Sequence, residues 1–94
     1  MMPYRLLYSR TSIDLIRKIH PELKSIVRVR IKKLIDNPYL GKRLEKELSG
    51  YLSLRAKRFR ILYKIREKNQ TIEIHYVGHR KDVYQLFREY VGAK

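Results

Sequence analysis

Residues 54–65, Leu-Arg-Ala-Lys-Arg-Phe-Arg-Ile-Leu-Tyr-Lys-Ile, decide the fold of this chain. From position 59 to position 66, every odd-numbered residue is apolar or aromatic, and three of the four even-numbered residues are Arg or Lys. A period of two is typical of a β-strand with one face on a core. The pattern therefore predicts a strand from Phe59 to Ile65 with a cationic outer face.

A second strand precedes this one. Leu52 and Leu54 alternate with more polar residues, and the short basic connection Ala56-Lys57-Arg58 separates the two runs. Two alternating runs joined by so short a link indicate a pair of antiparallel strands. Arg55 and Arg60 should then lie side by side on the outer face. Such a cationic face suits a phosphate-rich ligand.

The N-terminal part of the chain predicts one strand and two helices. Residues 4–8 form a short apolar strand candidate, and Ser9, Thr11 and Ser12 are candidate N-caps. Isoleucines then recur at helical spacing up to Pro21, which ends the first helix and suits the first position of a second. An apolar stripe with a period of 3.6 residues continues to Asn37-Pro38. Residues 38–50 follow as a connector.

The C-terminal part predicts a third late strand and a last helix. In residues 71–77, Ile72, Ile74 and Tyr76 alternate with Glu73, His75 and Val77. Gly78 ends this strand, and a helix is expected from about Arg80 to Tyr90, with Arg80, Tyr84 and Arg88 on one face because they are spaced by four residues. We therefore predict an α+β fold of order β-α-α-β-β-β-α. A small antiparallel sheet carries the helical hairpin on one face, and the short last helix lies near the other face or the end.

Length and charge limit the possible functions. Ninety-four residues are expected to form a single domain spanning residues 1–94. The formal net charge of +14 costs self-repulsion, which makes an acidic or polyanionic partner the natural explanation. The sequence has no cysteine, no apolar run of membrane-spanning length and no apolar signal-peptide core. We expect the protein to work in the cytoplasm.

Cofactor chemistry has little support in this sequence. His20, His75 and His79 do not have metal-ligand spacing with one another or with an acid, so no metal site is expected. No Gly-rich loop follows a strand, so no nucleotide cofactor is expected either. The remaining candidates are cationic and aromatic, because residues 42–66 contain nine bases and only two acids.

The chain resembles the RelE/ParE superfamily of bacterial and archaeal toxins. The resemblance rests on the order of elements, on the strand pair Tyr-Leu-Ser-Leu-Arg and Phe-Arg-Ile-Leu-Tyr-Lys-Ile, and on the run Val77-Gly-His-Arg-Lys-Asp-Val-Tyr84, which is most like the RelE branch. It covers essentially the whole chain. It implies a toxin of a type II toxin–antitoxin system that enters the ribosome, cuts mRNA without a metal, and is held in a hetero-oligomer by a small acidic antitoxin.

The resemblance also implies which residues form the site. Arg60 matches the family's arginine on the central strand, Arg80 the arginine after the glycine, and Tyr84 the helix tyrosine. His79 is added as a candidate catalytic residue because histidine exchanges protons near neutral pH, whereas arginine hardly loses its proton. The expected RNA-binding residues are Tyr51, Ser53, Arg55, Lys57 and Arg58. Tyr51 and Ser53 depart from the family, whose RelE-type members often carry lysines on this strand.

Two alternatives remain open at this point. The superfamily fold is shared by ParE-like toxins, which poison DNA gyrase without being enzymes, so fold alone does not decide between them. The missing strand lysines favour this alternative, whereas the Arg60, Arg80 and Tyr84 set favours ribonuclease activity. A non-catalytic relative that binds RNA through the same basic face is the second alternative.

Overall fold

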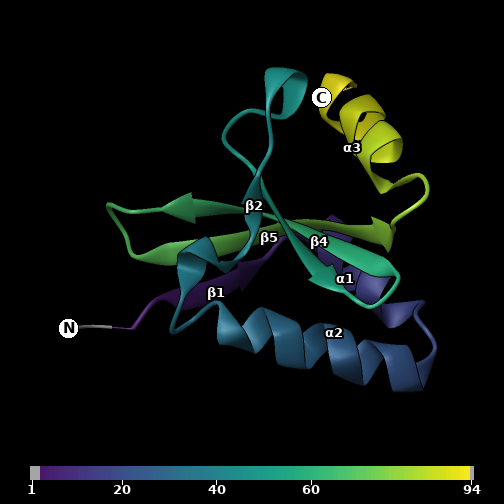
Figure 1. Cartoon of the computed structure of the whole chain (residues 1–94), viewed down its shortest axis with the longest axis horizontal. Helices are drawn as coiled ribbons and strands as arrows, with labels where there is room; N and C mark the ends of the chain where they lie inside the picture. Colours follow the sequence, from purple (N-terminus) through teal and green to yellow (C-terminus); the bar gives the residue numbers. More distant parts are fainter. Residues whose placement is uncertain (1–2, 94) are drawn as a thin grey trace.

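The computed structural model describes residues 3–93 and confirms the predicted α+β fold (Figure 1). The hairpin at the centre forms as expected, with Arg55 opposite Arg60 and Ala56 opposite Phe59. The elements in chain order are β1 (Arg5–Tyr8), α1 (Arg10–Arg17), α2 (Pro21–Lys33), the 3-10 turn η1 (Pro38–Leu40), β2 (Lys42–Arg43), the 3-10 turn η2 (Lys46–Leu48), β3 (Leu52–Ala56), β4 (Phe59–Arg66), β5 (Thr71–His79) and α3 (Val83–Gly92).

The sheet has five strands in the order β1-β5-β4-β3-β2. The three long strands β3, β4 and β5 form the predicted antiparallel meander, whereas β1 joins it in parallel beside β5. The connector contributes β2, a two-residue edge strand opposite Ser53 and Leu52. The sheet is therefore mixed rather than wholly antiparallel. Strand β2 could not be predicted from local pattern, because both of its residues are exposed cations without an apolar alternation.

The helical hairpin covers one face of the sheet (Figure 1). Of the three candidate caps, Ser9 caps α1, since its Oγ accepts a hydrogen bond from the Ser12 backbone N–H at 3.0 Å. Pro21 occupies the first turn of α2, as expected. Val27 and Ile31 of α2 are fully buried against the inward-facing side chains of the strands. This main core accounts for the apolar stripe of the second helix and for the odd-numbered residues of β4.

The other face of the sheet is partly covered by α3. A smaller core cluster joins Val83 and Phe87 of α3 to Leu62 of β4 and Leu48 of η2. Gly78 allows this approach, because a Cβ at that position would lie 2.9 Å from Val83 Cγ2. Leu62 is the one apolar residue on the even-numbered side of β4, and α3 packs against the sheet at this position.

Three expectations for the C-terminal part are wrong. The last strand does not end at Gly78 but continues to His79. The alternation predicted for residues 71–77 is broken by a β-bulge, because Leu62 pairs with Tyr76 while Tyr63 pairs with Ile74. The extra residue in β5 turns Tyr76 towards the α3 cluster and Val77 into the main core.

The last helix begins at Val83 rather than at Arg80. Arg80 lies in the turn before the helix. It does not share a helical face with Tyr84 and Arg88. No helix within residues 3–93 is both long and apolar enough to cross a membrane.

Candidate nucleic-acid interface

The β3–β4 turn places cations at one end of the sheet. Lys57 and Arg58 are both exposed and form a two-residue link between the paired residues Ala56 and Phe59. Lys57 has φ +57°, a left-handed conformation that costs a non-glycine residue on the order of 1 kcal/mol. The Arg58 carbonyl accepts a hydrogen bond of 2.7 Å from the Arg80 backbone N–H. The turn is therefore fixed to the segment that follows β5.

A groove of about 570 Å³ opens at this end of the sheet, between the turn, the start of α2 and the segment after β5. We call it the cationic groove. It brings together five of the nine predicted site residues, and its five basic side chains face one carboxylate. The lining residues are Glu22, Leu23, Ile26, Arg55, Lys57, Arg58, His79, Arg80 and Lys81. Concentrated positive charge in a concave surface attracts phosphate groups.

His79 lies in the cationic groove on the α2 side of the sheet. It pairs with Phe59 across β4 and β5, and the two ring centroids are 6.0 Å apart at an interplanar angle of 70°. Its Nδ1 accepts a hydrogen bond of 3.2 Å from the Lys81 backbone N–H, which fixes the orientation of the ring. Directly paired residues point to the same face, so His79 and Arg60 point to opposite faces of the sheet.

Arg60 lies beside the turn on the α3 side. It pairs with Arg55 on β3 and Gly78 on β5. Its Nη1 donates hydrogen bonds to the carbonyls of Lys57 at 3.2 Å and Phe59 at 3.0 Å. The guanidinium is thus folded back onto the turn, where it supports the backbone and keeps its charge next to the cationic groove.

Three of the predicted residues lie at the contact between α3 and the sheet instead of in the cationic groove. Tyr84 Oη and Ser53 Oγ form a hydrogen bond of 2.9 Å, and Ser53 is buried. The Tyr51 ring packs edge-on against Phe87 at 4.9 Å and against His75 at 5.3 Å. Tyr51 and Ser53 are thus packing and positioning residues in this conformation.

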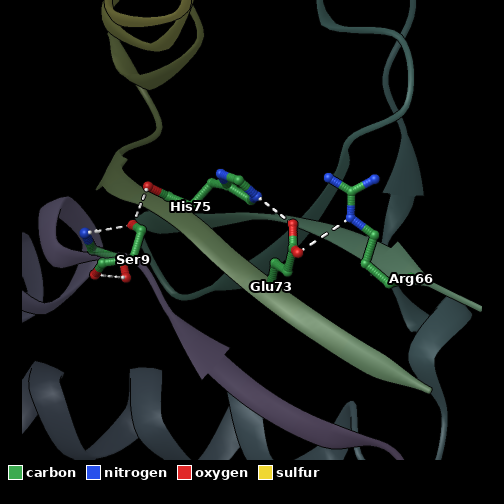
Figure 2. Close-up of polar contacts among 5 residues, drawn as sticks. Ser9, Arg66, Glu73 and His75 are labelled. Atoms are coloured by element: carbon green, nitrogen blue, oxygen red, sulfur yellow. Dashed lines mark hydrogen bonds and ion pairs between the residues drawn. The ribbon is translucent and has the colours of Figure 1, made fainter. Parts of the chain in front are cut away.

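Sequence reasoning missed a second polar cluster on the α3 side of the sheet (Figure 2). Glu73 Oε1 lies 3.0 Å from His75 Nε2, and Glu73 Oε2 accepts a hydrogen bond of 3.1 Å from Arg66 Nε. Burial alone would raise the pKa of Glu73, but the hydrogen bonds from His75 and Arg66 outweigh it and hold the pKa below its usual value. The signal in the sequence was a Glu and a His two residues apart on one strand, which places them on one face.

The sequence of the chain is similar to the sequences of known toxins. The chain matches the model of the "ParE-like toxin of type II bacterial toxin-antitoxin system" family over residues 6–88. It is 34% identical to Toxin RelG of Mycobacterium tuberculosis over 86 residues, which cover 89% of this chain and 99% of that relative. The chain therefore belongs to the ParE-like toxin family and is a toxin of a type II toxin–antitoxin system.

Solved structures place it within the RelE/ParE superfamily, as the resemblance predicted. The RelBE2 toxin–antitoxin complex of M. tuberculosis matches with a TM-score of 0.75 and 31% identity, over 83% of this chain and 99% of that chain. The isolated E. coli RelE toxin matches with a TM-score of 0.71 over 94% of this chain and 98% of that chain. Its identity is 16%, so it supports the fold alone.

Proposed function

We propose that this toxin is a metal-independent, ribosome-dependent endoribonuclease that cuts mRNA and so stops translation. The observation that carries the proposal is the cationic groove, in which Arg80 and the β3–β4 turn surround the imidazole of His79. A phosphodiester in such a groove would meet several fixed positive charges and one imidazole that can act in acid–base catalysis.

The reaction would be an attack of the RNA 2′-hydroxyl on the adjacent phosphorus. The 2′-oxygen forms a bond to phosphorus, the bond from phosphorus to the 5′-oxygen breaks, and a 2′,3′-cyclic phosphate is the product. His79 is proposed to take the proton of the 2′-hydroxyl at Nδ1, because an Nδ1 that accepts from the Lys81 backbone N–H leaves the proton of the neutral ring on Nε2. Bound RNA would then replace Lys81 as the partner of Nδ1. Arg80 is proposed to stabilise the negative charge on the phosphorane oxygens. Arg60 lies outside the cationic groove and is proposed to assist by holding the β3–β4 turn and by adding its charge beside it.

Arg55, Lys57 and Arg58 are proposed to bind the RNA backbone, because they extend the positive charge along the groove and across the turn. Tyr84 is proposed to protonate the leaving 5′-oxygen or to stack on a base. Its hydroxyl is bonded to the buried Ser53 outside the cationic groove, so either role would require Tyr84 to exchange Ser53 for the RNA. Tyr51 and Ser53 would contact RNA only at the margin of α3.

The antitoxin partner is proposed from charge and from relatives. The M. tuberculosis RelBE2 and E. coli RelBE structures are toxin–antitoxin complexes. A chain with a net charge of +14 would be complementary to a small acidic antitoxin that folds on contact. Toxin and antitoxin would form a hetero-oligomer in the cytoplasm, and the toxin alone would engage the ribosome and mRNA.

Gyrase inhibition of the ParE kind is the second candidate. One observation favours it: the strand positions where RelE-type toxins often carry lysines hold Tyr51 and Ser53, and both lie at the contact between α3 and the sheet. In that case the basic surface would serve protein binding, and His79 would have no role in proton transfer.

Primer extension on mRNA after brief induction tests the proposal. We expect cuts within reading frames that appear only on translated messages, and purified toxin should cut ribosome-bound mRNA but leave the same naked RNA whole. Intact transcripts accompanied by broken DNA would contradict the ribonuclease proposal and support gyrase inhibition. Binding of ribosomes without any cut would support the non-catalytic alternative.

A further inference from the structure

A groove at the β2 edge of the sheet lies apart from the proposed cleavage site. It has a volume of about 370 Å³, within the range of pockets that hold small organic groups. We call it the edge groove. Its floor and walls include Tyr39, Arg43, Leu44, Tyr51, Leu52 and Ile65. Ile65 and Phe59 lie near opposite ends of β4, about 20 Å apart by the rise of a strand, so the edge groove is separate from the cationic groove.

Tyr39 is an exposed aromatic ring that is held in place. Its side chain is 49% exposed, although it is large and mostly apolar. Its hydroxyl donates a hydrogen bond to Glu67 Oε1, and the Tyr4 hydroxyl donates to Glu67 Oε2 at 3.0 Å. The ring is thus fixed at its hydroxyl end while about half of its surface stays open. A fixed aromatic surface loses little conformational freedom when a ligand packs on it.

A cation lies over each of the two tyrosines of the edge groove. Arg43 Cζ is 5.9 Å from the centroid of the Tyr39 ring, and Lys64 Nζ is 4.7 Å from the centroid of the Tyr51 ring. Neither cation takes part in the ion pairs formed within residues 3–93. Their charges are therefore available to an anionic ligand.

The remaining lining side chains named above are aliphatic. Leu52 is buried, and Leu44 and Ile65 are half-buried against the two core clusters. The edge groove therefore combines an aromatic ring, an apolar floor and two cations. A ligand that satisfies all three has a flat, largely apolar group next to negative charge.

We propose that the edge groove binds an unpaired base of single-stranded RNA, with the base stacked on Tyr39 and the adjoining phosphates held by Arg43 and Lys64. The inference rests on the proposed action on RNA and adds a second contact about 20 Å from the cationic groove. Surfaces that hold single-stranded nucleic acid combine stacking aromatic rings with cations in this way. One RNA that reaches both grooves would bind more tightly than it binds to either alone.

An acidic protein segment fits the edge groove less well. Its carboxylates would pair with Arg43 and Lys64, but they would gain nothing from Tyr39, because the face of an aromatic ring is electron-rich. A nucleotide uses the ring and the cations together, since its base stacks while its phosphates meet the charges.

A probe with a single base tests the assignment on the purified full-length toxin. It is an oligonucleotide of about 6 positions, within the site sizes of single-strand binding proteins. Its central base is 2-aminopurine, whose fluorescence falls on stacking, and all other positions are abasic. Its sugars carry 2′-O-methyl groups, so a 2′-hydroxyl attack cannot cut it. The control is the same strand with every position abasic, which keeps the charge and removes the base.

We expect the fluorescence of the probe to fall on binding, and the amide chemical shifts of Leu40, Arg43 and Tyr51 to change in nuclear magnetic resonance spectra. Stacking of one base on an aromatic side chain strengthens binding by about fivefold to 150-fold. The abasic strand, bound to the wild type, should therefore bind at least about fivefold more weakly than the probe.

Two leucine variants form a matched pair, because leucine keeps apolar volume and removes the flat ring. Tyr39→Leu should weaken binding of the probe at least about fivefold and leave binding of the abasic strand unchanged. Tyr39→Phe keeps the ring and should stay within about threefold of the wild type. Tyr8 is similarly exposed, at 38%, but lies outside both grooves, so Tyr8→Leu should leave binding unchanged. Circular dichroism verifies that the variants fold.

Several results would overturn the assignment. These are equal binding of the probe and the abasic strand, equal effects of Tyr39→Leu and Tyr8→Leu, and shifts confined to the cationic groove. An oligoglutamate of equal charge that shifts the same amides as strongly would indicate a site for acidic protein and would also overturn it. Mapping and the strand comparison use the wild type, so the test stands even if a variant unfolds. Toxin that stacks the probe in the edge groove but cuts no mRNA would instead contradict the proposed function and leave this RNA contact in place.

Discussion

The sharpest test of the proposed site is Arg80→Ala. The Arg80 side chain is exposed, and its structural contact is made by the backbone, whose N–H donates to the Arg58 carbonyl at 2.7 Å. Alanine keeps that N–H. The free energy of unfolding should therefore change by less than about 0.5 kcal/mol, which corresponds to less than about 4 °C in Tm.

Activity should respond very differently. A fixed donor that meets charge developing in a transition state contributes about 2.7–4 kcal/mol, so its loss should slow mRNA cleavage roughly a hundredfold to a thousandfold. RNA binding should weaken less, because four other cations line the cationic groove. The logarithm of the binding constant falls with the logarithm of the salt concentration, and loss of one phosphate contact should make this slope less steep by about 0.7.

The assay is single-turnover cleavage of mRNA on programmed ribosomes, read by primer extension. Arg5→Ala is the matched control, because Arg5 pairs with Thr71 at the end of β5 remote from His79. That variant should cut at the wild-type rate. If folded Arg80→Ala protein also cuts at the wild-type rate, the reacting phosphate does not lie in the cationic groove.

Arg60→Ala is a less clean test of the same idea. Its guanidinium donates to the carbonyls of Lys57 and Phe59, so alanine removes two hydrogen bonds from the turn. Each contributes about 0.5–1.5 kcal/mol. A lost activity would then combine the missing charge with a loosened turn, and the change in Tm is needed to separate them.

Three further predictions follow from named contacts. Tyr84→Phe should slow cleavage at least about a hundredfold if the hydroxyl carries a proton; a loss below about threefold, measured in the same assay, would mean that the ring acts by stacking. Lys57→Gly should raise Tm by about 4–8 °C, because it relieves a left-handed backbone worth on the order of 1 kcal/mol, while RNA binding weakens; an unchanged or lower Tm would contradict the strain. The pKa of Glu73 is held below its usual value of 4.5, so the carboxylate stabilises the fold above about pH 4.5 and this stability is lost as the pH falls further. The Tm difference between wild type and Glu73→Gln should therefore shrink on acidification, and a difference constant down to about pH 3 would contradict the ion pair.

Local pattern was enough to predict the centre of the fold. The β3–β4 hairpin, the Arg55–Arg60 pair, the Ser9 cap and the start of α2 at Pro21 each depend on neighbours in the sequence. A period of two and a capping side chain report directly on the backbone that carries them. These features could therefore be derived from residue spacing alone.

The failures come from contacts between distant parts of the chain. The bulge in β5 is set by the register against Leu62 and Tyr63, which no pattern within residues 71–77 reveals. The helix α3 begins where Val83 packs on Gly78, so the turn at Arg80 lies outside the helix. The cationic groove likewise depends on Arg80 meeting Arg58, a contact across more than twenty residues.

The charge of α2 makes sense only when both of its sides are considered. Leu23 lines the cationic groove, whereas Lys24, Arg28 and Lys32 line a second groove between α2, α1 and Tyr8. Residues 21–33 contain five cations and one acid, and Lys24, Arg28 and Lys32 form two like-charge pairs four residues apart. Each such pair destabilises a helix by about 0.2–0.5 kcal/mol.

The fold tolerates this repulsion because α2 is held by burial rather than by its surface charges. Val27 and Ile31 are fully buried in the main core, and each such side chain contributes about 1.5–3 kcal/mol, several times the cost of a like-charge pair. A glutamate at position 24 or 32 would replace one of these two repulsive pairs with an ion pair to Arg28. Stability alone therefore favours a less basic helix, and the retained charge agrees with anionic partners on both sides of α2.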